Sequence, residues 1–282
     1  MDERCFDCPR KCGVKRDQTK GFCGEGDQIR VAKIIENFMW EEPCISGSKG
    51  ALAIFFSGCN LRCDFCQNYQ ISHVGKGDFY STKQFRELLL SYDLGKFSSI
   101  DLITPTHFSS LLVEALDGID LKIPVVWNSG GYENVETIEK LAKVVDVFLP
   151  DLKYFDEGLS LKLSKAKDYF KVASKAIKKM RQLKNENIFD EDGILQEGVL
   201  IRHLVLPGQS QDSKKLLDFI ASEIDSPFIS VMGQFTPVGN LIKERLKPLE
   251  YKIVLGYAEK LGLTDGYFQD LESADETFIP KF

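Results

Sequence analysis

Three cysteines lie close together in one short segment and have the spacing of metal ligands. Cys59, Cys63 and Cys66 form a CxxxCxxC pattern. Three thiolates can hold an iron-sulfur cluster and leave its fourth iron open, and an open position favours chemistry over a structural role. A small zinc site is the alternative, but no cysteine follows Cys66 to complete it, although His73 lies seven residues on. We therefore predict a 4Fe-4S cluster and interpret His73 as an ordinary polar residue.

The segment before these cysteines predicts a buried strand. Residues 50–57 read Gly-Ala-Leu-Ala-Ile-Phe-Phe-Ser, a short apolar run that begins at a glycine. The cysteines then fall on the loop after the carboxyl end of this strand. That is the end at which parallel α/β barrels carry their active sites.

The rest of the chain alternates strand and helix, which predicts βαβ units and a parallel sheet. Ser81 and Gln84 have capping-box spacing at the start of one helix. A longer helix is expected over residues 159–183, lying on the sheet, and an exposed loop over 185–198. Five further strands are expected at 100–103, 123–127, 144–149, 199–206 and 228–232.

Polar residues stand repeatedly at the ends of these strands. The second strand is followed by Thr104-Pro105-Thr106-His107, the third by Asn128-Ser129-Gly130-Gly131 and the fourth by Pro150-Asp151-Leu152-Lys153. The fifth carries Arg202 and His203 within an apolar run. A buried guanidinium needs a partner, because an unpaired buried charge loses several kcal/mol of hydration. We expect that partner to be a ligand carboxylate or a strand-end acid such as Asp151.

The cysteine pattern, with Phe65 before its last member, resembles the radical S-adenosylmethionine (SAM) superfamily. Six βα units match the partial TIM-type barrel that these enzymes share. The Asp-x-Lys segment at 151–153 and the Arg-x-x-x-x-Pro-Gly segment at 202–208 resemble the activating enzymes of pyruvate formate-lyase. The closest similarity is to an activating-enzyme-like subgroup, which does not identify the substrate.

The resemblance implies a role for each matching residue. Cys59, Cys63 and Cys66 would hold the cluster, and Phe65 would shield it. Lys153 would bind the SAM carboxylate, and Asp151 would bind the SAM ribose or a monovalent cation. Thr104 and Thr106 would bind the cofactor in place of the usual Gly-Gly-Glu segment. Asn128 and Ser129 would stand in place of Asp and Thr. The remaining implied cofactor residues are Arg202 and His203. The loss of an acid at Asn128 weakens the case for the cation.

Two of the histidines have structural alternatives. His107 could relay a proton or hydrogen atom, or it could begin the next helix. His203 could act in the active site or be a hydrogen-bonded core histidine.

A second cysteine set lies near the amino terminus. Its members are Cys5, Cys8, Cys12 and Cys23, with five basic residues nearby. Four thiolates can close a structural zinc site or a fully ligated iron-sulfur cluster, and we predict a second metal site of one of these kinds. Cys44 belongs to neither set and is expected to be a small buried hydrophobe.

Composition limits the alternatives. All eight cysteines precede residue 67, which favours metal clusters in a reducing compartment over disulfides. The formal net charge is −6, whereas nucleic-acid-binding proteins usually carry an excess of basic residues. No apolar run is long enough for a membrane span. We therefore expect a cytoplasmic protein, with no membrane partner and no nucleic acid.

These observations predict an α/β protein with a partial (βα)6 TIM-type barrel and a Cys-rich N-terminal extension. The expected parts are a metal-binding segment at 1–48, the barrel at 49–245, and a C-terminal helix and tail at 246–282. The expected activity is reductive cleavage of SAM to a 5′-deoxyadenosyl radical for hydrogen abstraction. Expected partners are a reductant such as flavodoxin or ferredoxin and a glycyl radical enzyme as the substrate. The alternative is an iron-sulfur electron-transfer protein that does not turn SAM over.

Overall fold

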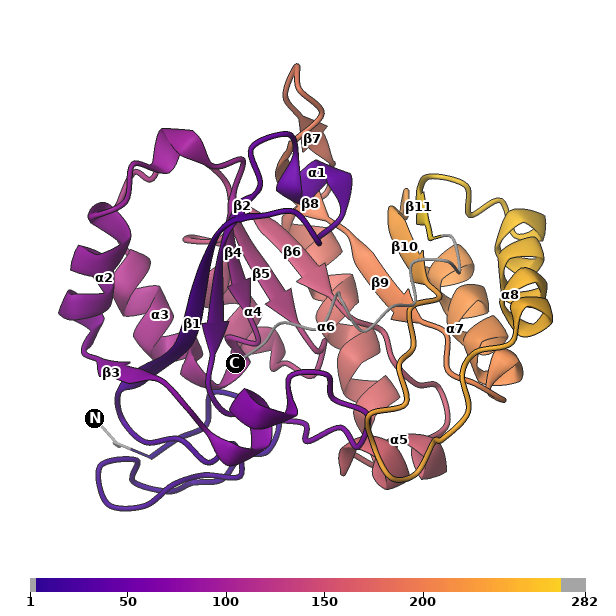
Figure 1. Cartoon of the computed structure of the whole chain (residues 1–282), viewed down its shortest axis with the longest axis horizontal. Coiled ribbons are helices and arrows are strands. Elements are labelled where there is room, and N and C mark those ends of the chain that lie inside the picture. Colours follow the sequence, from indigo (N-terminus) through magenta and orange to yellow (C-terminus); the bar gives the residue numbers. More distant parts are fainter. Residues whose placement is uncertain (1–3, 270–282) are drawn as a thin grey trace.

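The computed structural model describes residues 4–269 and contains two sheets (Figure 1). The larger sheet has the strand order β3-β1-β2-β4-β5-β6-β8-β7 and the smaller has the order β11-β10-β9. The strands are β1 (Ile29–Phe38), β2 (Ala51–Phe56), β3 (Asp78–Tyr80), β4 (Ile100–Ile103), β5 (Val125–Ser129), β6 (Val147–Pro150), β7 (Ile188–Phe189), β8 (Leu195–Val199), β9 (Ile201–Leu204), β10 (Ile229–Met232) and β11 (Gly266–Phe268).

The parallel strands continue from one sheet into the other. Strands β2, β4, β5, β6 and β8 pair in parallel, as do β9, β10 and β11. Only Leu200 separates β8 from β9, and the Leu152 amide donates to the Arg202 carbonyl at 2.7 Å, which links the end of β6 to β9. The predicted α/β fold with a mostly parallel sheet is confirmed.

Helices cover one face of this sheet (Figure 1). Alternation along each strand decides which side chains meet them. In β4, Ile100 and Leu102 belong to the main core with the helices, while Asp101 and Ile103 point to the other face. The helices are α1 (Pro43–Ser46), α2 (Thr82–Leu90), α3 (Ser109–Leu116), α4 (Val135–Leu141), α5 (Glu157–Ser164), α6 (Tyr169–Leu183), α7 (Ser210–Glu223) and α8 (Pro248–Lys260), with shorter turns at Gln70–Val74, Leu94–Lys96 and Thr106–Phe108.

The short helix α1 lies on the opposite, concave side of the sheet. Its Cys44 and Ile45 pack in a separate core cluster with side chains from β5, β6 and β8. Cys44 is 1% exposed, so its predicted role as a small buried hydrophobe is confirmed. The helix therefore occupies the interior of the partial barrel and brings the residues before it close to the strands.

Several elements differ from the sequence prediction. Strand β1 was not predicted; it pairs antiparallel with β2 and so brings part of the expected N-terminal segment into the main sheet. The helix expected over residues 159–183 is two helices, α5 and α6, because Lys165 adopts a left-handed conformation with φ 56° and ends the first. The capping box between Ser81 and Gln84 is present as predicted.

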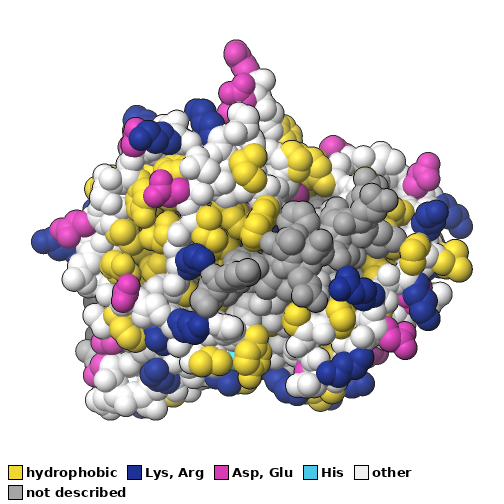
Figure 2. Space-filling view, in the orientation of Figure 1, with side chains coloured by type: hydrophobic (Ala, Val, Ile, Leu, Met, Phe, Trp, Pro, Cys, Tyr) yellow, Lys and Arg dark blue, Asp and Glu magenta, His cyan; other side chains and the backbone are white. Residues whose placement is uncertain are grey.

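The C-terminal segment adds to the barrel. Helix α8 is followed by β11, which pairs in parallel with β10, while residues 270–282 lie outside the described part. Within residues 4–269, no helix is both long enough and apolar enough to cross a membrane. On the face shown in Figure 2, charged side chains of both signs lie mainly around the outline, and hydrophobic side chains gather over the region of β1 and β2.

Candidate active site

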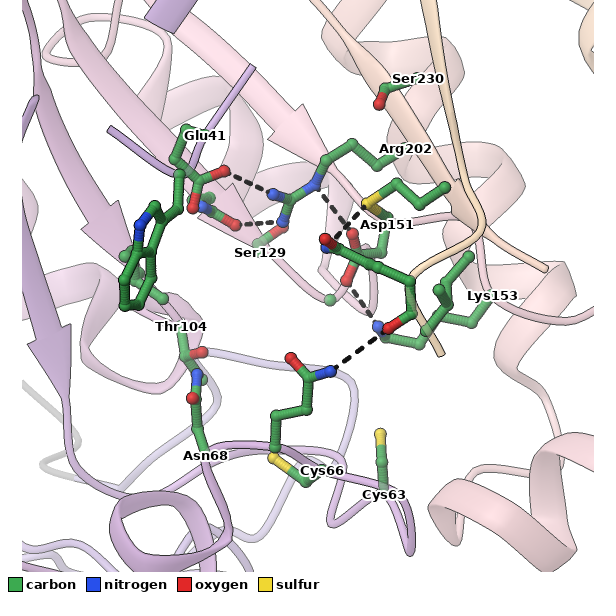
Figure 3. A pocket seen from close by; sticks show the side chains of 18 of the residues that line it. Glu41, Cys63, Cys66, Asn68, Thr104, Ser129, Asp151, Lys153, Arg202 and Ser230 are labelled. Carbon is green, nitrogen blue, oxygen red and sulfur yellow. Dashed lines mark hydrogen bonds and ion pairs between the residues drawn. The ribbon is translucent and has the colours of Figure 1, made fainter. Parts of the chain in front are cut away.

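A cavity of about 350 Å³ opens on the concave side of the sheet. All three cysteines of the CxxxCxxC pattern line it. So do most of the residues predicted to bind a cofactor, namely Phe65, Thr104, Asn128, Ser129, Asp151, Lys153 and Arg202. Figure 3 shows Cys63 and Cys66 at one end and Arg202 with Glu41 toward the other. Parallel strands bring these side chains together because their carboxyl ends share one edge of the sheet.

The cysteine loop is held by hydrogen bonds to the sulfur atoms. The Ser164 hydroxyl donates to Cys63 Sγ at 2.9 Å, and the Leu61 amide donates to Cys59 Sγ at 3.3 Å. The hydroxyl of Ser72 lies 3.2 Å from Cys66 Sγ. Donors at this position stabilise a thiolate, the form in which cysteine binds metal. The donor set therefore suits a cluster held by three thiolates.

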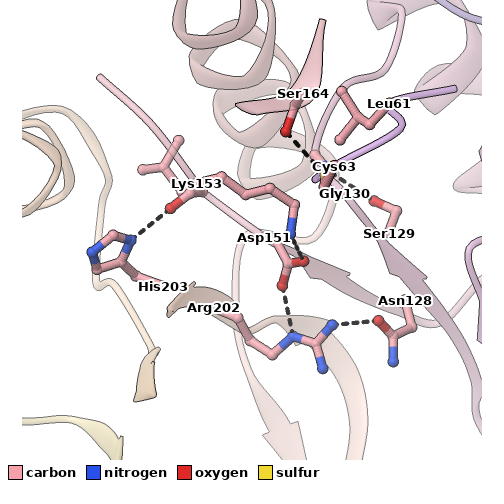
Figure 4. A network of polar contacts seen from close by, with 12 residues as sticks. Leu61, Cys63, Asn128, Ser129, Gly130, Asp151, Lys153, Ser164, Arg202 and His203 are labelled. Carbon is pink, nitrogen blue, oxygen red and sulfur yellow. Dashed lines mark hydrogen bonds and ion pairs between the residues drawn. The ribbon is translucent and has the colours of Figure 1, made fainter. Parts of the chain in front are cut away.

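A charged network crosses the cavity wall (Figure 4). Lys153 Nζ donates to Asp151 Oδ2 at 2.5 Å, and Arg202 Nε donates to Asp151 Oδ1 at 3.0 Å. The predicted pairing of Arg202 with Asp151 is thus present. Burial alone would raise the pKa of Asp151, but the two cations outweigh it and lower that pKa. Asp151 is therefore a carboxylate at neutral pH, and Lys153 stays protonated because the same carboxylate raises its pKa.

Sequence reasoning missed the other acids around Arg202. Glu41 Oε2 accepts from Arg202 Nη1 at 2.8 Å, and Glu42 Oε2 lies 4.0 Å from the same nitrogen. Arg202 Nη2 also donates to the Asn128 side-chain oxygen. The acids precede α1 in a segment with no strand or helix periodicity, so their position depends on how α1 enters the barrel. The adjacent Glu-Glu-Pro segment was the one sequence signal available.

Phe65 covers the cavity from the cysteine side. It is 7% exposed and packs between Tyr154 and Phe235, with ring centroids 6.5 and 5.8 Å away. The contact with Phe235 ties the cysteine loop to the chain that follows β10. Phe65 thereby fills this end of the cavity, next to the cysteines that it is predicted to shield.

Three predicted residues lie outside the cavity lining. The Thr106 hydroxyl donates to buried Glu133 at 2.9 Å. His107 Nε2 lies 2.6 Å from the Ser57 carbonyl, and burial with nearby Arg16 lowers its pKa to about 3. Thr106 therefore does not meet the expectation of contact with a cofactor in this cavity. His107 lies in the turn Thr106–Phe108 directly before α3, which agrees with the alternative that it begins the next helix.

His203 also points away from the cavity (Figure 4). Its Nδ1 lies 2.8 Å from the Leu152 carbonyl and its Nε2 lies 2.9 Å from the Ser213 hydroxyl. Burial lowers its pKa to about 4, so the ring is neutral at pH 7. The expected cofactor contact is wrong for this residue, because alternation along β9 sends Arg202 and His203 to opposite faces. The alternative of a hydrogen-bonded core histidine describes it.

The N-terminal cysteines form a loop of their own beside the first set. The pKa of Cys8 is raised to about 12, first by burial and also by the nearby thiols of Cys5, Cys23 and Cys12. The Cys23 carbonyl accepts from the Cys59 amide at 3.4 Å, so the two loops touch. Within residues 4–269, no three Cys, His, Asp or Glu side chains converge closely enough to hold one metal ion.

Arginine side chains bind the two loops together. Arg10 Nε donates to the Asn60 carbonyl at 2.7 Å, and Arg62 Nε donates to the Phe22 carbonyl at 3.2 Å. Both guanidinium groups lie over the Phe22 ring, at 3.9 and 5.2 Å from its centroid. These contacts keep the N-terminal cysteine loop against the CxxxCxxC loop.

Comparison with known families identifies the fold and the cysteine site together. The model of the radical SAM superfamily matches residues 53–220, a range that contains the cysteine loop and most of the charged network. The chain belongs to the radical SAM superfamily. Membership implies a 4Fe-4S cluster and SAM as its cofactors. A related protein, Uncharacterized protein MJ0674 of Methanocaldococcus jannaschii, is 31% identical over 279 residues, which cover 93% of this chain and 76% of that protein.

Solved structures share this fold at low sequence identity. SuiB of Streptococcus suis matches 77% of this chain with a TM-score of 0.54 and 15% identity, and its SAM-bound form matches 82% with a TM-score of 0.51. This chain spans about half the length of SuiB, 49% in both comparisons. A domain of the pyruvate-formate lyase-activating enzyme from Bacteroides vulgatus matches 58% of this chain at 14% identity. Its TM-score of 0.45 is too low to support a closer placement.

Proposed function

We propose that this chain is an enzyme that binds a 4Fe-4S cluster through Cys59, Cys63 and Cys66 and cleaves SAM reductively. The observation that carries the proposal is the placement of these three sulfurs at one end of a cavity whose wall holds Lys153, Asp151 and Arg202. When bound and reduced, the cluster supplies one electron to SAM, which yields methionine and a 5′-deoxyadenosyl radical that abstracts a hydrogen atom from a substrate.

The protein's own residues would bind and orient SAM. The Lys153 ammonium is the cation of the network nearest to the cysteines in Figure 3, which suits it to the SAM carboxylate. Asp151 holds Lys153 in place and has both oxygens engaged, one by Lys153 and one by Arg202. Asn128, Ser129 and Thr104 would present neutral polar groups to the rest of SAM. An electron carrier has no need for such a network at the end of a barrel.

The finer assignment rests on the resemblance to activating enzymes. We propose membership in the pyruvate formate-lyase activating-enzyme-like subgroup, with the Asp151 to Lys153 segment as its main support. A glycine in a partner glycyl radical enzyme is the substrate that this assignment favours. A structure of SuiB is described as bound to its precursor peptide, so the shared fold also admits polypeptide substrates. The electron would come from a flavodoxin or a ferredoxin.

We further propose a second metal centre at Cys5, Cys8, Cys12 and Cys23. Four cysteines in one loop match in number the ligand set of a structural zinc site or of a fully ligated 4Fe-4S cluster. The thiols of Cys5, Cys12 and Cys23 are near enough to Cys8 to raise its pKa. Their loop contacts the CxxxCxxC loop through the Cys23 carbonyl, so this centre would support the first loop whichever metal it holds.

The proposed function is tested by anaerobic reconstitution with iron and sulfide, reduction, and chromatography for 5′-deoxyadenosine after SAM is added. Wild type is expected to form the product and Cys63→Ala to form none. Cys44→Ala is the matched control, because Cys44 is buried outside both cysteine sets. The proposal is contradicted if Cys63→Ala forms 5′-deoxyadenosine at the wild-type rate. It is also contradicted if wild type with an intact reduced cluster forms no 5′-deoxyadenosine, a result that would favour an electron carrier.

A further inference from the structure

Two adjacent acids line the cavity without a part in the proposed SAM site. Glu41 and Glu42, here called the acidic pair, come from the turn between β1 and α1. Their side chains are only 11% and 8% exposed. In Figure 3, Glu41 lies beside Arg202, and both are at the end of the cavity away from Cys63 and Cys66. Glu41 therefore borders the part of the cavity distant from the cysteines.

Carboxyl groups outnumber cations in this part of the cavity. Arg202 is surrounded by the carboxyl groups of Asp151, Glu41, Glu42 and Asp101. Lys153 is the other cation of the network and pairs with Asp151. Burial raises the pKa of Asp101 well above its usual range and raises that of Glu41 to about 7, so a proton can neutralise either of these two acids.

Glu42 is the member that lacks a close partner. Its Oε2 atom is buried and accepts no hydrogen bond among the described residues, and Arg202 is 4.0 Å away. Although Glu42 precedes the first residue of α1, its side chain does not cap that helix. Neither helix capping nor a close ion pair explains why a carboxylate occupies this place. This buried, unbonded oxygen belongs to a residue that lines the cavity wall.

The neighbouring side chains suit an organic cation. Trp40 and Tyr267 line the same cavity, and the Trp40 ring packs against Phe38 with centroids 5.3 Å apart. An aromatic face beside a carboxylate favours ammonium and guanidinium groups, which gain from both contacts. A neutral or anionic ligand would leave the carboxylate of Glu42 uncompensated.

We propose that the acidic pair binds a cationic group of the substrate, a primary ammonium or a guanidinium, through Glu42. This inference rests on the proposed function and narrows its substrate class. Glu41, already bonded to Arg202, would fix the position of the pair, and Glu42 would accept the ligand's hydrogen bond. The reacting carbon would then lie toward the cysteines, on the SAM side of Arg202.

The test is calorimetric titration of the reconstituted, SAM-loaded protein with n-butylamine and n-butylguanidine, with 1-pentanol as the neutral probe. Wild type is compared with Glu42→Gln, which keeps the shape and removes the charge. Glu87→Gln is the matched control, because Glu87 is an exposed glutamate on α2. We expect Glu42→Gln to weaken binding of at least one cation by tenfold or more and to leave pentanol binding unchanged.

The opposite results are equally clear. The inference is overturned if wild type and Glu42→Gln bind the two cations with equal affinity. It is also overturned if wild type binds pentanol as tightly as it binds both cations. A fall of several degrees in the unfolding midpoint of Glu42→Gln would also overturn it. If Glu42 serves a ligand, removing its buried charge should stabilise the free protein. If Glu42 serves the fold, removing the charge should destabilise it. Binding is measured without turnover. A protein that binds the cations but forms no 5′-deoxyadenosine would refute the proposed function alone.

Discussion

Replacement of Arg202 by methionine should destabilise the protein in a pH-dependent way. The guanidinium is 12% exposed and bonds to Asp151 at 3.0 Å and to Glu41 at 2.8 Å. Breaking a buried ion pair from one side typically costs about 3–5 kcal/mol. Asp151 keeps Lys153 at 2.5 Å, so Glu41 is the carboxylate that loses its hydrogen-bonded cation. We therefore expect a loss near the lower limit, about 3 kcal/mol.

The loss should grow as pH rises. Burial raises the pKa of Glu41 above its unfolded value, and Arg202 only partly offsets this. Without Arg202 the folded pKa rises further. A group whose folded pKa exceeds its unfolded pKa contributes its full stability below the unfolded pKa and loses it as pH rises through the folded pKa. Arg202→Met should therefore be nearer to wild type at pH 5 than at pH 8.

Denaturant unfolding at pH 5 and pH 8 measures both effects. A loss of about 3 kcal/mol corresponds to a midpoint about 6–12 °C lower in thermal unfolding of a chain of this size class. Lys252→Met, at an exposed position of α8, serves as the control and should change stability by less than about 0.5 kcal/mol. A loss below about 1 kcal/mol at pH 8, or an equal loss at both pH values, would refute the reasoning.

Three further predictions follow from the site. Lys153→Ala should lower SAM affinity at least tenfold by calorimetry, and an unchanged affinity would remove Lys153 from the SAM site. Gly131→Ala should lower the free energy of unfolding, measured in urea, by about 1–3 kcal/mol. The reason is that Gly131 has φ +72° and an added Cβ would lie 2.2 Å from the Asp151 carbonyl oxygen. A variant as stable as wild type would contradict this. Cys12→Ser should lose one metal centre by elemental analysis while the Cys63 centre remains, and an unchanged metal content would exclude Cys12 as a ligand.

The arrangement of the parallel strands could be predicted because it depends on local patterns. Short apolar runs separated by helical stretches predicted six strands, and these occur as β2, β4, β5, β6, β9 and β10. Strand β8 lies almost entirely within residues 185–198, for which an exposed loop was predicted, and that prediction is wrong there. Residues just after such strands share one edge of a parallel sheet whatever the loops do. For this reason Thr104, Asn128, Asp151 and Lys153 were expected together, and all four line one cavity.

Other elements could not be predicted because their signals are mixed or weak. Strand β1 carries charged residues among apolar ones and is half-exposed along much of its length, so it lacks the pattern of a buried strand. The break between α5 and α6 depends on a left-handed lysine, Lys165, in a stretch whose apolar spacing continues. Its carbonyl accepts a hydrogen bond from Arg10, which lies far away in the sequence.

The sequence by itself determined the cysteine pattern and the order of the predicted parallel strands along the chain, since these depend on neighbours a few residues apart. Only the tertiary structure decided which charges meet. Glu41 and Arg202 are 161 residues apart and bond because α1 packs against β5, β6 and β8 and so brings the turn before it to Arg202. It also separated Arg202 from His203, which are adjacent in sequence but face opposite sides. Long-range packing sets such partners, and local periodicity carries no information about it.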